Sequence, residues 1–383
     1  LQPTGAIADS YRVVLPEDRA EIMRRDGDLT TTTDILVSPE DDAEVRRVSI
    51  ANTGSEVREI EVTSYAEIVL AAPAADTAHP AFAKLFVETS YDVECQALLA
   101  TRRRRAPHEP EIWAAQVAVV EGGTVGPEAC ETDRARFLGR GQEPRAPLAM
   151  QPGQQLSGTV GTVLDPIFAL RRRVRIAPGA VARIAFWTMV AASRQEVLDL
   201  ADKHRDPTAF ERAAALAWTQ AQVQLRHLGI AAGEADLFQR LAGHVLEADP
   251  RLRPPSLVIR QGAGGQSGLW PHGSSGDLPI VLVQVHDSED GELCRQLLQA
   301  HEYWRMKPLA VDLVIVNERA ASYVQDLQTA LETMVRTSQS RSLIAGDGAK
   351  GSVYVLRADL IQRETRALLQ ATARAVLVSR QGT

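Results

Sequence analysis

The chain has 383 residues, of which 45% are hydrophobic and 24% are charged, and its formal net charge is −7. This composition is typical of a folded globular protein, and the length predicts two or three domains. Arginine clusters occur only at Arg102–Arg105 and Arg171–Arg173, so we expect no broad basic face and no nucleic-acid partner.

Cys95, Cys130 and Cys294 are odd in number and lack CxxC spacing, which is typical of a reducing compartment. We therefore expect a cytoplasmic location. The sequence contains no apolar stretch of about 18 residues and no secretion-signal pattern at its N-terminus, so we expect no membrane span in this chain. Because it starts without a methionine and stops just after an apolar segment, we expect it to be part of a larger protein.

Before Ser193 the sequence alternates between strand-like runs and turn signals. Short runs spaced about 8 to 12 residues apart predict an antiparallel sandwich, and their number predicts large stacked sheets. Two hairpins are indicated by the turns Asn52–Ser55 and Pro178–Gly179. The predicted strands are Ser10–Leu15, Asp18–Arg24, Leu29–Val37, Val45–Asn52, Arg58–Ala66, Lys84–Ser90, Leu98–Arg102, Ile112–Val120, Gly158–Val163, Phe168–Ile176 and Ala180–Val190.

From Arg194 the period becomes helical. Ser193 and Glu196 form a capping-box pattern, and apolar residues recur at helical spacing through Thr208–Leu228 and Glu234–Leu246. These helices predict a linker, residues 193–249, between a strand-rich domain, residues 1–192, and a third domain, residues 250–383.

The third domain alternates apolar strands with amphipathic helices, which predicts a small parallel sheet with right-handed βαβ crossovers. The predicted strands are Leu278–Val285, Ala310–Val316 and Val353–Leu356, and the predicted helices are Gly291–Met306, Ser322–Thr337 and Arg363–Val376. Ligands of such sheets bind beyond the carboxyl ends of the strands, here near His286–Asp287 and Asn317–Arg319. Glu318 is our candidate at that edge.

The glycine-rich loop Gln266–Asp277 enters the first of these strands. Trp270, His272 and Asp277 lie on it, and loop aromatics and carboxylates are common ligand contacts. A structural interpretation stays open, in which Trp270 packs as a lid on the core and Asp277 caps a turn.

Motifs for catalysis and for bound cofactors are absent from the sequence. It has no GxGxxG after a strand, no GxxxxGK[ST], no GxSxG and no HExxH, and its acidic pairs lie in turns. His227 and His244 lack a second ligand at i+3 or i+4, so we expect no metal site. We expect no cofactor and no catalytic residue within this chain.

Several long segments, in this order, resemble the cyclic β-1,2-glucan synthases of Gram-negative bacteria. They are the run from Ser10 to Tyr91, RARFLGRG at 134–141, TVLDPIFALRRRVRI at 162–176, LAWTQAQVQLRHLGI at 216–230 and SGLWPHGSSGDLPIVLVQV at 267–285. The loop departs from the family's LWAYGISGDLP-like pattern, because Pro271–His272 and Ser274–Ser275 stand where that pattern has an aromatic and an apolar residue.

The resemblance implies a segment of a large inner-membrane glycosyltransferase whose C-terminal region is related to cellobiose and chitobiose phosphorylases. Residues 1 to about 205 would then form the β-supersandwich that precedes the catalytic helical barrel of those phosphorylases. No segment here resembles that barrel, so no catalytic residue is carried over. The resemblance also implies a position on the cytoplasmic side of the inner membrane, with the remaining domains of the parent synthase as partners.

Two functions follow from these expectations. The favoured one is a non-catalytic carbohydrate-binding or scaffolding segment, in which Trp270, His272, Asp277 and Glu318 contact a β-1,2-glucan. The alternative is a glycoside phosphorylase or transferase, active in its own right at the junction of the sandwich and the α/β domain.

Overall fold

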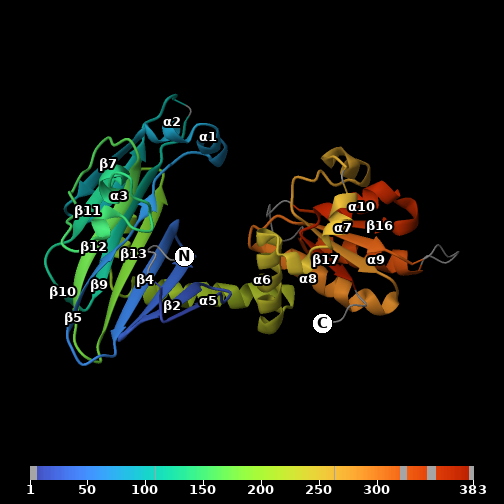
Figure 1. Cartoon of the computed structure of the whole chain (residues 1–383), viewed down its shortest axis with the longest axis horizontal. Coiled ribbons are helices and arrows are strands. Elements are labelled where there is room, and N and C mark those ends of the chain that lie inside the picture. Colours follow the sequence, from blue (N-terminus) through green and yellow to red (C-terminus); the bar gives the residue numbers. More distant parts are fainter. Residues whose placement is uncertain (1–6, 108, 263, 320–325, 343–350, 379–383) are drawn as a thin grey trace. The chain divides into compact units, whose positions relative to one another are not determined.

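A computed structural model describes residues 7–107, 109–262, 264–319, 326–342 and 351–378. The chain divides into two compact units, Leu1–Ala221 and Gln222–Thr383, and Figure 1 shows the elements of each. Helix α5 (Ala209–Leu228) contains the division. Within the described residues, no helix is both long and apolar enough to cross a membrane.

The first unit contains two antiparallel sheets. The larger has eight strands in the order β1-β2-β3-β4-β13-β9-β8-β7, and the smaller has five, with β12 at its centre bonded to β10, β11, β5 and β6. The strands are β1 (Ser10–Val14), β2 (Ala20–Asp26), β3 (Leu29–Val37), β4 (Ala43–Asn52), β5 (Arg58–Thr63), β6 (Ala66–Glu67), β7 (Val87–Asp92), β8 (Ala97–Arg102), β9 (Trp113–Glu121), β10 (Gly123–Thr124), β11 (Ala129–Asp133), β12 (Pro166–Ile176) and β13 (Val181–Ala191).

Alternation along the strands builds two cores around the larger sheet. Ile184 faces the smaller sheet and packs with Phe168 and Leu170 of β12. On the opposite face, Trp187 packs under helix α4 (Arg194–His204) and the start of α5. The expected antiparallel supersandwich is therefore confirmed.

Three short helices interrupt the strand-rich region, which the sequence analysis treated as strands and turns alone. Helices α1 (Pro73–Ala78) and α2 (Pro80–Lys84) each begin with a proline, which is favoured at the first helical position because it has no N–H to leave unpaired. Helix α3 (Arg134–Leu138) begins after Asp133, whose carboxylate accepts from the backbone N–H of Ala135 at 2.9 Å.

The predicted strand Gly158–Val163 is wrong, and strand β11 was not foreseen. Gly158 and Gly161 have φ angles of 69° and 108°, which take the backbone out of the extended conformation. Only an isolated bridge between Gly161 and Thr89 forms within this stretch. The short helix η1 (Leu148–Met150) precedes this stretch.

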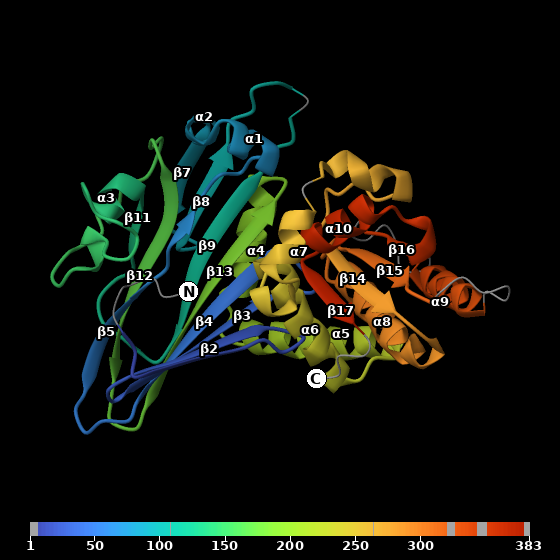
Figure 2. The same ribbon diagram turned by 45° about the vertical axis from the view of Figure 1, so that its right-hand side comes forward.

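The second unit is a four-stranded parallel sheet in the order β16-β15-β14-β17, which confirms the expected small parallel sheet. Residues 281, 283 and 285 of β14 pack beneath α6, α8 and α9, whereas residues 280 and 282 pack with Leu269 and α10. Helices therefore cover both faces of the sheet (Figure 2). The elements are α6 (Ala232–Glu247), η2 (Pro250–Leu252), α7 (Ser256–Gln261), η3 (Gln266–His272), β14 (Ile280–Val285), η4 (Ser288–Asp290), α8 (Gly291–Met306), β15 (Asp312–Asn317), α9 (Asp326–Ser342), β16 (Val353–Arg357), η5 (Ala358–Leu360), α10 (Arg363–Thr372) and β17 (Ala375–Val378).

One expectation for this unit is corrected, and one helix was not expected. The predicted helix Arg363–Val376 ends at Thr372, because the apolar residues that follow form β17 and pair in parallel with β14. Helix α7 was not foreseen, although Pro255 precedes its first residue. Residues 322–325 of the predicted helix Ser322–Thr337 lie outside the described residues.

Candidate functional site

The loop from Gln266 to Asp277 presents an exposed tryptophan beside polar groups. Trp270 lies in the short helix η3 and is 62% exposed. Its indole Nε1 donates to the carbonyl oxygen of Ser275 at 3.3 Å, which holds one edge of the ring against the loop. The interpretation of Trp270 as a lid on the core is therefore wrong, and most of the indole is available to a ligand.

An open hollow of about 500 Å³ lies next to this indole. Gln266 spans it, because its Nε2 donates to the carbonyl of Ser275 at 2.8 Å and to Oδ1 of Asp277 at 2.9 Å. Asp277 is exposed, so its carboxylate keeps acceptor capacity for a hydroxyl group. The lining consists of Gln266, Trp270, Gly273, Ser274, Ser275 and Asp277.

Two glycines allow the loop to close around the hollow. Gly273 and Gly276 have φ angles of 84° and 75°, in the left-handed region that favours glycine. A Cβ at Gly273 would lie 3.3 Å from Cε1 of Tyr354, and one at Gly276 would lie 2.9 Å from Cγ of Gln266. A side chain at either position would therefore strain the loop and crowd its neighbour.

Ser274 anchors the floor of the hollow to the sheet. It is 3% exposed, and its Oγ hydrogen-bonds Oδ2 of Asp312 at 3.1 Å. Oδ1 of the same carboxylate accepts from the backbone N–H of Ser352 at 3.1 Å. Asp312 begins β15 and Ser352 precedes β16, so the loop is tied to the amino-terminal edge of the parallel sheet.

The structure brings together only two of the four predicted site residues. Trp270 and Asp277 line the hollow, whereas His272 ends η3 and is not part of the lining. Glu318 follows the carboxyl end of β15, about 20 Å from the start of that strand. Its Oε1 accepts from Arg366 at 2.6 Å and from Gln284 at 3.1 Å, so this carboxylate is held by neighbouring side chains.

Gln266 and the Ser274–Asp312 pair were missed by the sequence analysis. The family-like pattern has an apolar residue where Ser274 stands, and this was the available signal that the Ser274 side chain is buried. A carboxylate within an otherwise apolar predicted strand was the matching signal at Asp312. No local pattern marked Gln266, because its partners lie 9 and 11 positions away.

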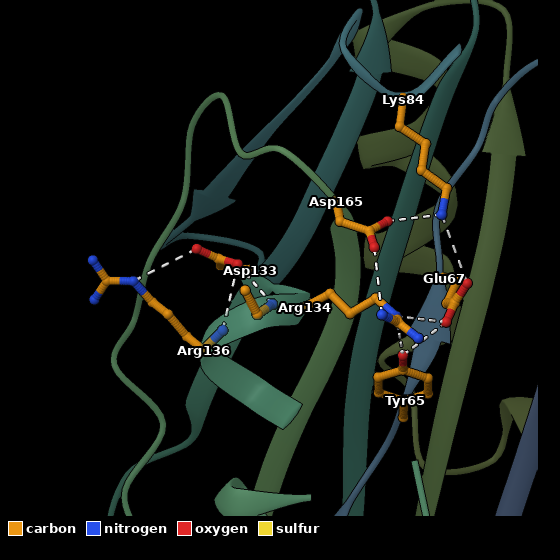
Figure 3. A network of polar contacts seen from close by, with 8 residues as sticks. Tyr65, Glu67, Lys84, Asp133, Arg134, Arg136 and Asp165 are labelled. Carbon is orange, nitrogen blue, oxygen red and sulfur yellow. Dashed lines mark hydrogen bonds and ion pairs between the residues drawn. The ribbon is translucent and has the colours of Figure 1, made fainter. Parts of the chain in front are cut away.

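A second polar cluster lies in the first unit, between α2, α3 and strands β6 and β12 (Figure 3). Lys84 contacts Asp165 at 2.7 Å, and Arg134 contacts Glu67 at 2.8 Å and the Tyr65 hydroxyl at 3.2 Å. Asp165 also lies 3.5 Å from Arg134. Two cations thus face two carboxylates, an arrangement that clamps the short helices to the sheet.

The electrostatics of this cluster indicate a structural role. Burial and the nearby Glu67 carboxylate raise the pKa of Tyr65 to about 12. Burial would raise the pKa of Glu67, but hydrogen bonds from Arg134 and Tyr65 outweigh it and hold that pKa below its usual value. Neither group would exchange a proton near neutral pH, so neither suits general acid–base catalysis.

Potential metal ligands do not gather in one place within the described residues. Across the described ranges, no group of three or more His, Cys, Asp or Glu side chains could hold a metal ion.

Comparison with known proteins places the chain in a family. The profile of the glycosyl hydrolase 94 supersandwich domain matches residues 1–207. The chain belongs to this family. The chain is also similar to the cyclic beta-(1,2)-glucan synthase NdvB of Rhizobium meliloti (strain 1021), to which it is 41% identical over 382 residues. The match covers 100% of this chain but spans only 13% of the length of that synthase.

Solved structures of carbohydrate-active enzymes show weaker similarity. A bacterial glucoamylase bound to acarbose aligns with 55% of this chain and 28% of its own, at 8% identity and a TM-score of 0.30. The GH36 alpha-galactosidase AgaB from Geobacillus stearothermophilus aligns with 91% of this chain and 43% of its own, at 7% identity and a TM-score of 0.25. These scores are too low to carry an argument.

Proposed function

We propose that this chain is a non-catalytic carbohydrate-binding or scaffolding segment of a cyclic β-1,2-glucan synthase. The observation that carries the proposal is the 41% identity to such a synthase along the whole chain, together with an exposed indole beside a polar hollow. The remaining domains of the parent synthase would be its partners, on the cytoplasmic side of the inner membrane.

The Trp270 hollow supports the binding half of this proposal. A glucose ring presents an apolar C–H face that can stack on an indole, and its hydroxyl groups can donate to a carboxylate. Trp270 offers the ring face and Asp277 the acceptor, and Gln266 fixes the carboxylate from the other side. Glu318 would contribute only to a separate site, because it lies at the opposite edge of the sheet.

The absence of catalysis is proposed because the partners of these carboxylates do not suit glycoside hydrolysis. In the clamp of Figure 3, Glu67 and Asp165 both face cations. At the sheet edge, Glu318 is held by Arg366 and Gln284. Glycoside hydrolysis uses two carboxyl groups that flank one bond, and Asp277 is the one carboxylate in the described lining of the Trp270 hollow.

Calorimetric titration of the purified chain with linear and with cyclic β-1,2-glucans tests the proposal. Saturable binding to either glucan, with no release of glucose 1-phosphate in the presence of phosphate and no release of free sugar, is the expected result. Glucose 1-phosphate release that a point substitution in the chain abolishes would instead establish the phosphorylase alternative. Absence of any glucan binding would leave only the scaffolding role.

A further inference from the structure

Helices α8 and α9 of the second unit form a groove of about 540 Å³ that lies apart from the Trp270 loop. The end of α5 closes it, where Gly229 adopts a φ of 65° and the N–H of Ile230 bonds back to the carbonyl of Leu225 at 3.0 Å. The lining consists of Leu228, Gly229, Arg295, Leu298, Gln299, Glu302, Thr333, Met334, Thr337 and Ser338.

The groove combines an apolar part with one buried carboxylate. Leu228, Leu298 and Met334 supply the apolar surface. Glu302 is only 9% exposed, and its Oε1 accepts a hydrogen bond from the Ser338 hydroxyl. The ion pair that the described residues of α8 form joins Arg295 to Glu292 and does not include Glu302. A buried carboxylate without a cation is costly, because burial removes its hydration and nothing replaces the lost charge stabilisation.

The other charges at the groove do not compensate Glu302. Arg295 lines the groove, but its guanidinium donates to Glu292 at 2.9 Å and to Gln299 at 2.8 Å. Glu292 and Arg295 therefore neutralise each other at the rim, and among the described side chains Glu302 gives the groove a net negative charge. A ligand that brings a positive charge on an apolar stem would satisfy both the carboxylate and the apolar surface.

We propose that the α8–α9 groove binds a basic side chain of a polypeptide partner, whose ammonium or guanidinium group pairs with Glu302 while its aliphatic stem packs on Leu298 and Met334. A sugar is a poorer match, because the lining contains no aromatic ring on which a pyranose could stack. The inference does not depend on glucan binding at the Trp270 hollow.

Amide resonances of the isotope-labelled full chain, titrated with agmatine and separately with glucose, test this proposal. Agmatine carries a guanidinium on an aliphatic chain, so we expect saturable shifts at Leu298, Glu302 and Ser338. Glu302→Gln keeps the side-chain shape but removes the charge, and should weaken agmatine binding about tenfold or more. Glu364→Gln is the matched control, because Glu364 is exposed on α10 and is not part of the groove lining, and it should leave agmatine binding nearly unchanged.

The same variants give a second measurement that needs no ligand. If Glu302 is an uncompensated buried charge, Glu302→Gln should melt at the same temperature as the unmodified chain or higher. A clear fall in melting temperature would overturn the proposal, because it would mean that the carboxylate is already compensated. Groove shifts with glucose but not with agmatine, or no groove shifts with agmatine, would also overturn it.

Discussion

The exposure of Trp270 predicts that removing its indole lowers the free energy of unfolding only slightly. Trp270→Ala removes an indole that is 62% exposed and makes one hydrogen bond of 3.3 Å, so we expect the free energy of unfolding to fall by only about 1 kcal/mol. Trp304 is the matched control in the same unit, because it is 1% exposed and its Nε1 donates to the Phe238 carbonyl at 3.0 Å. Trp304→Ala should cost about 3 to 5 kcal/mol, since it leaves a cavity in the core.

Urea unfolding followed by far-ultraviolet circular dichroism measures both costs on the same chain. The two variants should differ by about 2 kcal/mol or more in the free energy of unfolding. Equal and large losses would refute the reasoning, because they would show that the Trp270 indole supports the fold as Trp304 does. Trp270 could then not serve as a free platform for a ligand.

Three further predictions concern pH, the loop and the domain boundaries. Burial lowers the pKa of His301 from 6.5 to about 4, so its contribution to stability is full above pH 6.5 and is lost progressively, by about 3 kcal/mol in all, as pH falls to about 4. His301→Gln should flatten that part of the stability profile, and an unchanged slope would contradict the assignment. Gly276→Ala should cost about 1 to 3 kcal/mol and displace Gln266 from the hollow; an unchanged melting temperature would argue against the strained loop. Limited proteolysis should cut first within Pro250–Gly265 or Ser338–Gly351, and first cleavage inside Val45–Tyr65 would be inconsistent with the proposed boundaries.

Elements with a strong local signal were predicted closely. Helix α8 has both predicted ends, Gly291 and Met306, and the β12–β13 hairpin turns at Pro178–Gly179, where Gly179 has a φ of 72°. In these cases the period of apolar residues and the turn chemistry agree with the tertiary structure. The parallel sheet followed from the same agreement, because its strands are buried on both faces and read as continuous apolar runs.

Features that depend on distant partners could not be predicted in this way. Strand β17 looked like the end of a helix, and only its pairing with β14 makes it extended. The contact between Lys84 and Asp165 joins residues 81 positions apart, and no local pattern signals it. The candidate site shows the same limit: Trp270 and Asp277 share one loop and were predicted together, whereas the distance to Glu318 depends on the direction of β15.

Glucan affinity of Trp270→Ala, compared with that of the unmodified chain by calorimetric titration, tests the central claim most directly. If the indole stacks on a glucose ring, the substitution should cost about 1 to 3 kcal/mol of binding free energy, which weakens β-1,2-glucan binding at least about fivefold. Equal affinity of the two proteins would contradict the assignment of the Trp270 hollow as the glucan site.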